Sequence, residues 1–148
     1  MDNNPPSKPS GPLAEFTSRP TFQLAIPALD LGALRVFYVD LLGSSVHRED
    51  ANSLELIFFG GRLQAYKVTK MPETVAGQRG GKSVPVPNFG LLMSWVDWHR
   101  AVDHLNYVGI TYRLLPTTLA GPDGGTEAWF AITDPSGNCL AFGTSRGD

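Results

Sequence analysis

The sequence has only one cysteine, Cys139, so no disulfide bond forms within the chain. Its place in an apolar stretch predicts a buried thiol rather than a reactive one. No apolar run approaches the ~18 residues that a membrane-spanning helix needs, and no membrane partner is expected. The first residues are rich in Pro, Asn and Ser, where an export signal would have a charged end and an apolar core. A cytoplasmic location is therefore predicted, and the low cysteine content agrees with it.

The chain also lacks an excess of basic residues, since charged residues make up 18% of the 148 positions and the net charge is -2 at pH 7. A general nucleic-acid-binding protein needs clustered basic side chains for its phosphate contacts, so no nucleic-acid partner is expected. Lys67 and Lys70, with Arg79 and Lys82, come nearest to a basic patch, and their pattern is typical of a solvated loop. The hydrophobic content of 42% predicts one globular domain with a full core.

The N-terminal residues 1–19 contain four prolines among Asn, Ser and Gly. This composition buries too little apolar area to offset the entropy lost on ordering. We expect a flexible Pro-rich tail over residues 1–19, followed by a single domain over residues 20–146. A docking peptide in the polyproline II conformation stays open as an alternative for the tail, although its PxxP pattern is not specific enough to name a partner.

The first part of the predicted domain, about residues 21–70, has the pattern of one strand, one helix and three strands. A short apolar strand over residues 22–26 stops at Pro27, which cannot donate the next ladder hydrogen bond. Asp30 is the expected N-cap of an amphipathic helix, and Gly43 follows its last turn. Three strands are expected after the helix, with a tight turn at Gly60-Gly61: residues 44–49, 53–59 and 62–70.

The second part, about residues 87–145, repeats the first. Asn88 follows Gln23 by 65 residues, and Gly109 follows Gly43 by 66. A strand and a helix with an N-cap at Ser94 are expected, and then three more strands: residues 88–93, 95–108, 110–115, 127–133 and 137–143. Such spacing favours a repeat of one supersecondary unit over two unrelated domains.

Residues 71–86 are predicted to be a linker without regular structure, because they contain several Gly and Pro residues and no hydrophobic periodicity. Within them, Gly80-Gly81-Lys82-Ser83 lacks the upstream glycine and the following helix of a phosphate-binding loop. No nucleotide site is predicted there.

Five short motifs occur in a fixed order along the chain: Phe22 to Pro27 with Asp30-Leu31 and Phe37-Tyr38, Asp40 to Gly43, Phe58-Phe59-Gly60, Val84 to Gly90, and Asp134 to Asn138. In this order and spacing they resemble the glyoxalase, bleomycin-resistance and extradiol dioxygenase superfamily, also called the vicinal oxygen chelate (VOC) superfamily. The resemblance covers residues 21–144. It implies an α+β fold, in which two βαβββ modules form a cupped mixed sheet with the helices outside. Many relatives are homodimers, so a homodimer is expected.

In enzymes of this superfamily, metal ligands lie on the first and fourth strands of each module. The resemblance puts Gln23, Tyr66, Asn88 and Ala141 at these positions, where related sequences have His or Glu. Carboxamide oxygens are neutral, a phenol with a pKa near ~10 is a reluctant ligand, and alanine has no ligand atom. The ligands are thus predicted to have been replaced, and no metal or other cofactor is expected.

No other cluster in the sequence predicts a catalytic or metal site. His99 and His104 lie on the second predicted helix and point about 140° apart, so they cannot hold one ion. His47 is expected at the surface of a strand. Glu55 and Glu127 are the remaining strand carboxylates, and each is more typical of a surface residue than of a cleft residue. Spacing indicates no Ser-His-Asp or Cys-His arrangement.

The polar residues Gln23, Tyr66 and Asn88, together with the aromatic residues Phe58 and Trp129, are the predicted ligand-binding residues. Conversion of a vacated metal site into ordinary packing is the alternative. The pocket is favoured because buried polar side chains without partners cost free energy, so that drift in a core would select apolar residues.

The predicted function is that of a metal-free protein that binds a small aromatic or cationic molecule in the cleft, as bleomycin-resistance members do. Two other hypotheses stay open. One is a lyase or dioxygenase with an atypical metal site or with Tyr66 as an acid/base group. The other is a protein-interaction module built on the same scaffold.

Overall fold

A computed structural model describes residues 18–147 of the chain, and most of the predicted tail lies outside the described residues. The helices and strands follow one another in this order: β1 (Gln23–Ala28), α1 (Leu31–Arg35), the π-helical segment η2 (Val36–Leu41), β2 (Ser45–Glu49), β3 (Ser53–Phe58), β4 (Gly61–Lys67), β5 (Val75–Arg79), β6 (Lys82–Val86), β7 (Asn88–Met93), α2 (Trp95–Tyr107), β8 (Leu114–Ala120), β9 (Thr126–Thr133) and β10 (Cys139–Arg146). None of the helices among these residues has the length and apolar character needed to cross a membrane.

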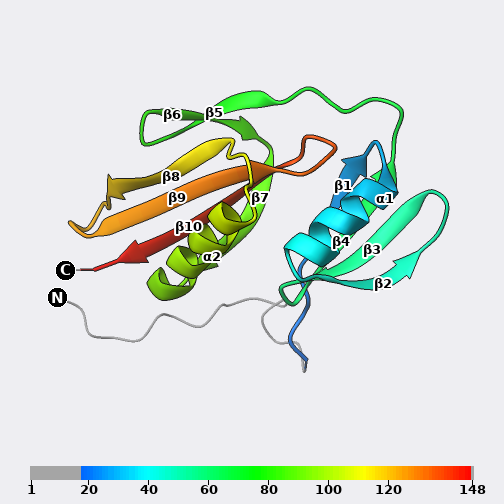
Figure 1. Ribbon diagram of the computed structural model, residues 1–148, viewed down its shortest axis with the longest axis horizontal. Helices are drawn as coiled ribbons and strands as arrows, with labels where there is room; N and C mark the ends of the chain where they lie inside the picture. The colour runs from blue at the N-terminus through cyan, green and yellow to red at the C-terminus, as the bar shows by residue number, and fades with distance from the viewer. Residues whose placement is uncertain (1–17, 148) are drawn as a thin grey trace.

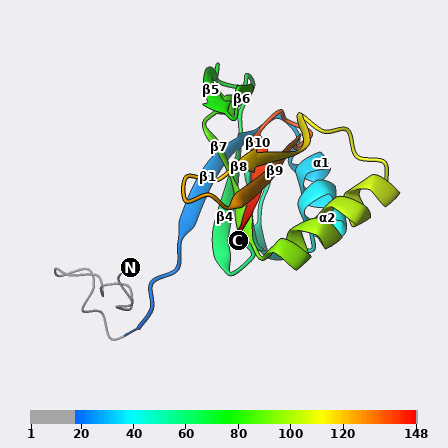
Figure 2. The same ribbon diagram turned by 90° about the vertical axis from the view of Figure 1, so that its left-hand side faces the viewer.

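Each module forms its own four-stranded sheet, with the strand orders β1-β4-β3-β2 and β7-β10-β9-β8. The first and last strands of a module run parallel, β1 beside β4 and β7 beside β10, and the other pairings in the two sheets are antiparallel. Both α1 and α2 lie on the same side of the sheets (Figures 1 and 2). The predicted α+β fold of two βαβββ modules with the helices outside is confirmed.

Capping residues set the helix ends as predicted. The Asp30 side chain accepts a hydrogen bond from the backbone N–H of Ala33 at 3.1 Å, and Ser94 caps α2 in the same way through the N–H of Asp97 at 3.2 Å. Gly43 and Gly109 follow the two helices with φ of 77° each, a conformation that suits glycine because it has no Cβ.

Alternate strand residues face the helices and form one hydrophobic core. Leu54 and Leu56 of β3 are buried, while Glu55 between them faces the other side of the sheet. The core cluster includes Leu34 from the first module and Trp98 from the second, and the Trp98 Nε1–H also donates to the carbonyl of Phe142 at 3.0 Å. The two modules therefore share one core.

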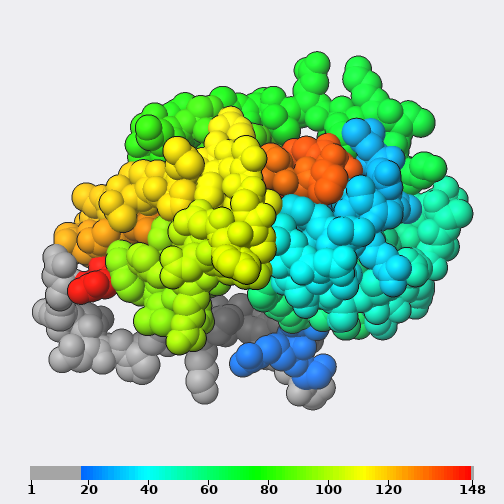
Figure 3. Space-filling model, viewed as in Figure 1, coloured from blue at the N-terminus to red at the C-terminus, as the bar shows by residue number. Residues whose placement is uncertain are grey.

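The turn between β9 and β10 ties the second module to the first. The Leu29 N–H donates to Ser136 Oγ at 2.9 Å, and Asn138 Nδ2 donates to the carbonyl of Pro27 at 2.9 Å. Figure 3 shows this turn in orange at the surface, against the blue and cyan of the first module. A turn predicted from its local sequence thus also forms long-range contacts.

The prediction that residues 71–86 lack regular structure was wrong, because β5 and β6 form an antiparallel hairpin there. Gly80 and Gly81 make its turn with φ of 57° and 76°. Two glycines between two five-residue strands are a standard hairpin signal. Pro85 and the weak alternation of apolar residues obscured it.

The strand predicted over residues 110–115 begins later, since β8 spans Leu114–Ala120. Its pairing with β9 is irregular between Leu114 and Thr117, on either side of Pro116. Proline is tolerated here because β8 is an edge strand and the irregularity removes the need for its missing N–H.

Candidate functional site

Four of the five predicted ligand-binding residues lie on the strand faces that point away from the helices. Gln23, Tyr66, Asn88 and Trp129 each alternate with neighbours that pack into the core. Phe58, the fifth, belongs to the core and is 9% exposed. The Phe58 side chain therefore points toward the helices, whereas the other four side chains point away from them.

The β5–β6 hairpin covers the outer face of the second sheet. Val84 of the hairpin is buried in a small cluster with Leu114, Ala131 and Cys139, against which Trp129 packs. The hairpin thus occupies space that the sequence assigns to a ligand.

Polar contacts hold the same hairpin in place. Asn88 Nδ2 donates to the carbonyl of Pro85 at 2.8 Å, and Arg113 Nη1 donates to the carbonyl of Ser83 at 3.3 Å. The Arg79 guanidinium carbon lies 3.8 Å from the ring centroid of Trp129, a cation–π contact. Asn88 and Trp129 are therefore already engaged by the protein itself.

The outer face of the first sheet carries polar side chains that pair with one another. Tyr66, 48% exposed, donates its hydroxyl hydrogen to Gln64 Oε1 at 2.7 Å. Arg62 Nη1 donates to Glu55 Oε1 at 3.0 Å in a partly exposed ion pair. Gln64 and Arg62 were not among the predicted site residues.

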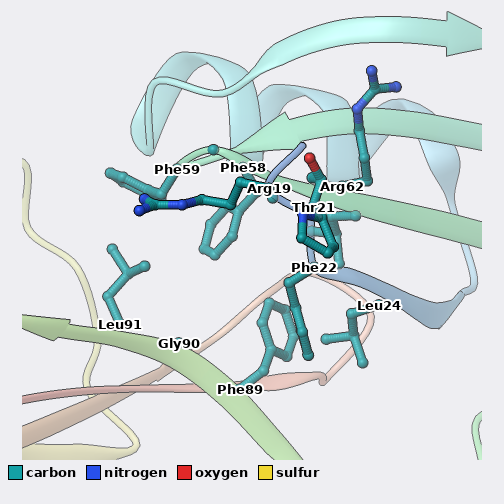
Figure 4. A pocket seen from close by; sticks show the side chains of 14 residues that line it. Arg19, Thr21, Phe22, Leu24, Phe58, Phe59, Arg62, Phe89, Gly90 and Leu91 are labelled. Atoms are coloured by element: carbon teal, nitrogen blue, oxygen red, sulfur yellow. The ribbon is translucent and has the colours of Figure 1, made fainter. Parts of the chain in front are cut away.

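A pocket of about 410 Å³ lies between the two modules. Its apolar wall comes from β1 and the segment before it, from the β3–β4 turn and from β7: Phe22, Leu24, Phe58, Phe59, Phe89 and Leu91. Phe58 and Phe89 meet across the module boundary with their ring centroids 5.8 Å apart. Figure 4 shows Phe58 pointing into this inter-module pocket, and Arg19 extending across it toward Phe59. Its volume is within the range of small-molecule sites.

Phe59 has an unusual conformation at the wall of the inter-module pocket. Its φ is 47°, and it precedes Gly60, whose φ is 81°, in the turn between β3 and β4. Asn or Gly is the usual residue for such a corner, since a left-handed conformation costs other residues ~1 kcal/mol or more. The Phe59 ring is also 57% exposed. Backbone strain and an exposed aromatic ring thus coincide at one residue.

Three of the solved structures with similar folds carry names of one superfamily. The chain matches a glyoxalase/bleomycin resistance protein/dioxygenase from Alicyclobacillus acidocaldarius with 25% identity and a TM-score of 0.72, covering 87% of this chain and 93% of that one. A lactoylglutathione lyase from Agrobacterium tumefaciens (16% identity, TM-score 0.59, 87% and 96% covered) and a glyoxalase family protein from Enterococcus faecalis (20%, 0.59, 84% and 97%) have the same fold. By its fold the chain belongs to the VOC superfamily. No protein-family model and no curated protein matches the sequence.

The repeat of the VOC modules identifies a further position in the predicted ligand set. In the second sheet, Gly90 comes two residues after Asn88 in β7, and it pairs with Ala141 of β10. In the first sheet, the equivalent residue is Ala25, two residues after Gln23 in β1, and it pairs with Gln64 of β4. The register therefore makes Gln64, rather than Tyr66, the counterpart of Ala141. Sequence alone missed it because strand register cannot be counted without the pairing.

The side chains at these VOC positions do not fit a divalent metal ion. Gln23, Gln64, Asn88 and Ala141 offer neutral carboxamides and a methyl group, without imidazole or carboxylate. Two of the amides already bond to Tyr66 and to the carbonyl of Pro85. Over residues 18–147, no three His, Cys, Asp or Glu side chains are placed so that they could hold an ion together.

Cys139, beside Asn88 in the register, is buried as predicted. Burial raises the pKa of its thiol, and the opposing effect of the Arg113 charge is smaller. The thiol is therefore protonated at neutral pH and is a weak nucleophile.

Proposed function

We propose that this VOC chain is a metal-independent binding protein for a small, largely apolar molecule, which it holds in the inter-module pocket. The observation that carries the proposal is the composition of that pocket, where four phenylalanine rings surround about 410 Å³. Apolar walls with few polar groups are the usual make-up of a small-molecule site.

This proposal moves the ligand from the cleft predicted by sequence to the helix-facing side of the sheets. On the outer face, the hairpin covers Asn88 and Trp129, and Tyr66 and Gln64 bond to each other. Among the described residues, no hairpin covers the inter-module pocket; the Arg19 side chain extends across it, and Phe22 in its wall is 77% exposed. Exposed aromatic groups around a concavity are a common mark of a binding site.

Metal independence is proposed from the side chains at the VOC ligand positions. Binding without catalysis is also the activity attributed to bleomycin-resistance members, and the relative from Alicyclobacillus acidocaldarius carries that name among its three. Apolar walls bind by removing ligand surface from water, which needs no metal ion.

The proposal is tested with Nile red, a neutral dye that fluoresces in apolar sites, added to the full chain in the presence of EDTA. We expect saturable fluorescence that is unchanged when Zn²⁺, Ni²⁺ or Mn²⁺ replaces EDTA. Leu91→Trp places an indole in the pocket and should abolish the signal, because Leu91 is part of the pocket wall.

Leu92→Trp is the matched control, since Leu92 is the next residue in β7, is 82% exposed and is not part of this wall. It should bind the dye like the wild type. Equal dye binding by the two variants, or dye binding that requires a metal ion, would overturn the proposal.

A further inference from the structure

The inter-module pocket adjoins a second apolar pocket of about 300 Å³, and the two have Phe59 and Leu91 in common. The second pocket lies between the end of η2 and α2, with Leu42, Met93, Ala101 and Phe142 in its walls. Because one pair of side chains borders both cavities, an elongated apolar molecule can contact both by passing Phe59.

Charge is distributed unevenly along these two cavities. The residues that line the inter-module pocket include two arginines and no acidic residue. Arg62 is paired with Glu55, and Figure 4 shows its guanidinium pointing away from the pocket. Arg19 instead extends across the pocket and forms no ion pair with another described residue. The Arg19 guanidinium, which Figure 4 shows near Phe59, is thus a cation in the inter-module pocket without an acidic partner in the described chain.

The second pocket has a different electrostatic character. Asp97, Arg100 and His104 of α2 line it together. The carboxylate of Asp97 repels an anionic group there and offsets the attraction of Arg100. An anionic ligand group is consequently favoured beside the Arg19 guanidinium in the inter-module pocket rather than in the second pocket.

Resting on the proposed function, we propose that the ligand is a monocarboxylic acid with an extended apolar tail. Its carboxylate pairs with the Arg19 guanidinium, which lies across the inter-module pocket near Phe59, and its tail passes Phe59 into the second pocket. A guanidinium binds a carboxylate through charge-assisted hydrogen bonds, and the phenylalanine and leucine walls remove the tail from water. We propose this class in place of the aromatic or cationic ligand expected from the sequence, since no acidic residue lines the inter-module pocket to bind a cation.

The test measures displacement of Nile red from the full chain by octanoic, decanoic and dodecanoic acids, each below its micelle concentration, and by dodecan-1-ol below its solubility limit. Affinity should rise about fourfold for each added methylene group. Dodecanoic acid should bind about tenfold more tightly than dodecan-1-ol.

Two variants examine the head group. Arg19→Gln should lower the affinity for dodecanoic acid to that for dodecan-1-ol, and it should leave the affinity for the alcohol unchanged. Arg48→Gln, an equal change of charge at an exposed site on β2, should alter neither. Equal binding of acid and alcohol by the wild type would overturn the carboxylate assignment while leaving the proposed function intact.

One further variant examines the path of the tail. Ala101→Trp fills the second pocket, and should reduce dodecanoic acid to about the affinity of octanoic acid while octanoic acid itself binds normally. Normal octanoic acid binding also shows that the variant is folded. If the affinity of this variant rose with tail length as much as that of the wild type, the assignment of the second pocket to the tail would be overturned. Absence of all Nile red binding in the wild type would instead reject the proposed function.

Discussion

The hydroxyl group of Tyr38 donates a hydrogen bond to the buried carboxylate of Asp134 at 2.8 Å, across 96 residues of sequence. Asp134 also accepts hydrogen bonds from the backbone N–H groups of Ser136 and Asn138 at 2.9 and 3.0 Å, and from Asn138 Nδ2 at 2.9 Å. Burial raises the pKa of Tyr38 far above its usual value, and the neighbouring Asp134 charge adds to the effect. A neutral phenol thus joins the first module to the turn of the second.

Tyr38→Phe removes this donor while keeping the buried ring. We expect the free energy of unfolding to fall by about 2 kcal/mol, because the Asp134 carboxylate stays buried with one partner fewer. Urea denaturation followed by tryptophan fluorescence measures the change. Tyr112→Phe is the control, since Tyr112 donates to Asn106 at an exposed site and should lose less than about 1 kcal/mol. Equal losses in the two variants would contradict a special role for the inter-module bond.

The raised pKa of Tyr38 also predicts how stability depends on pH. An unfolded tyrosine ionises near pH ~10, whereas the folded protein keeps the Tyr38 proton at higher pH. The unfolded state therefore binds fewer protons above that pH, so the contribution of Tyr38 is complete below about pH 10 and decreases as the pH rises further. Unfolding measured between pH 8 and about pH 11 should show the wild type losing up to about 1.4 kcal/mol more per pH unit than Tyr38→Phe at the alkaline end. Parallel curves would exclude Tyr38 as the source.

Local patterns in the sequence were sufficient to predict most of the fold. The helix ends were predicted from the capping residues Asp30, Gly43, Ser94 and Gly109. The strand face that packs into the core was predicted from the alternation of apolar and polar residues, as in residues 53–58. These features depend on neighbours within a few residues, which is why composition and spacing predict them.

The candidate site was less predictable, because it depends on contacts between distant segments. Trp129 and Asn88 were predicted to face a ligand, but their nearest partners come from the hairpin over residues 75–86. Phe58 was grouped with them although it faces the core. The packing of the β5–β6 hairpin on the second sheet and the contact between Phe58 and Phe89 both join distant segments, so neither produces a periodic pattern in the sequence.

Gly143→Ala should loosen the hairpin that covers the second sheet. A Cβ at Gly143 would lie 2.5 Å from the Trp129 ring, so the indole has to move away from Arg79. We expect the free energy of unfolding to fall by about 2 kcal/mol and amide hydrogen exchange in β5 and β6 to accelerate. Hydrogen exchange followed by mass spectrometry measures the second effect. Gly147→Ala, where no atom lies within 4 Å, should leave both quantities unchanged. Unaltered exchange in the hairpin of Gly143→Ala would show that Trp129 does not anchor it.

Phe59 provides a test in which stability and binding respond in opposite directions. In its left-handed conformation, with φ of 47°, Asn is less strained than Leu, so Phe59→Asn should be more stable than Phe59→Leu by about 1 kcal/mol. Both variants lose the edge-to-face contact with Phe58, whose ring centroid is 4.9 Å away.

In the inter-module pocket, however, Leu keeps an apolar wall and Asn does not. Nile red should therefore bind Phe59→Leu more tightly than Phe59→Asn, by about tenfold for the apolar contact removed. Thermal or urea unfolding ranks the two variants by stability, and dye titration ranks them by affinity for Nile red. If Leu ranked above Asn in both measurements, the strain at Phe59 would be unimportant. If Asn ranked above Leu in both, the Phe59 side chain would not contact the ligand, since only a residue that is strained and also borders the pocket reverses the order.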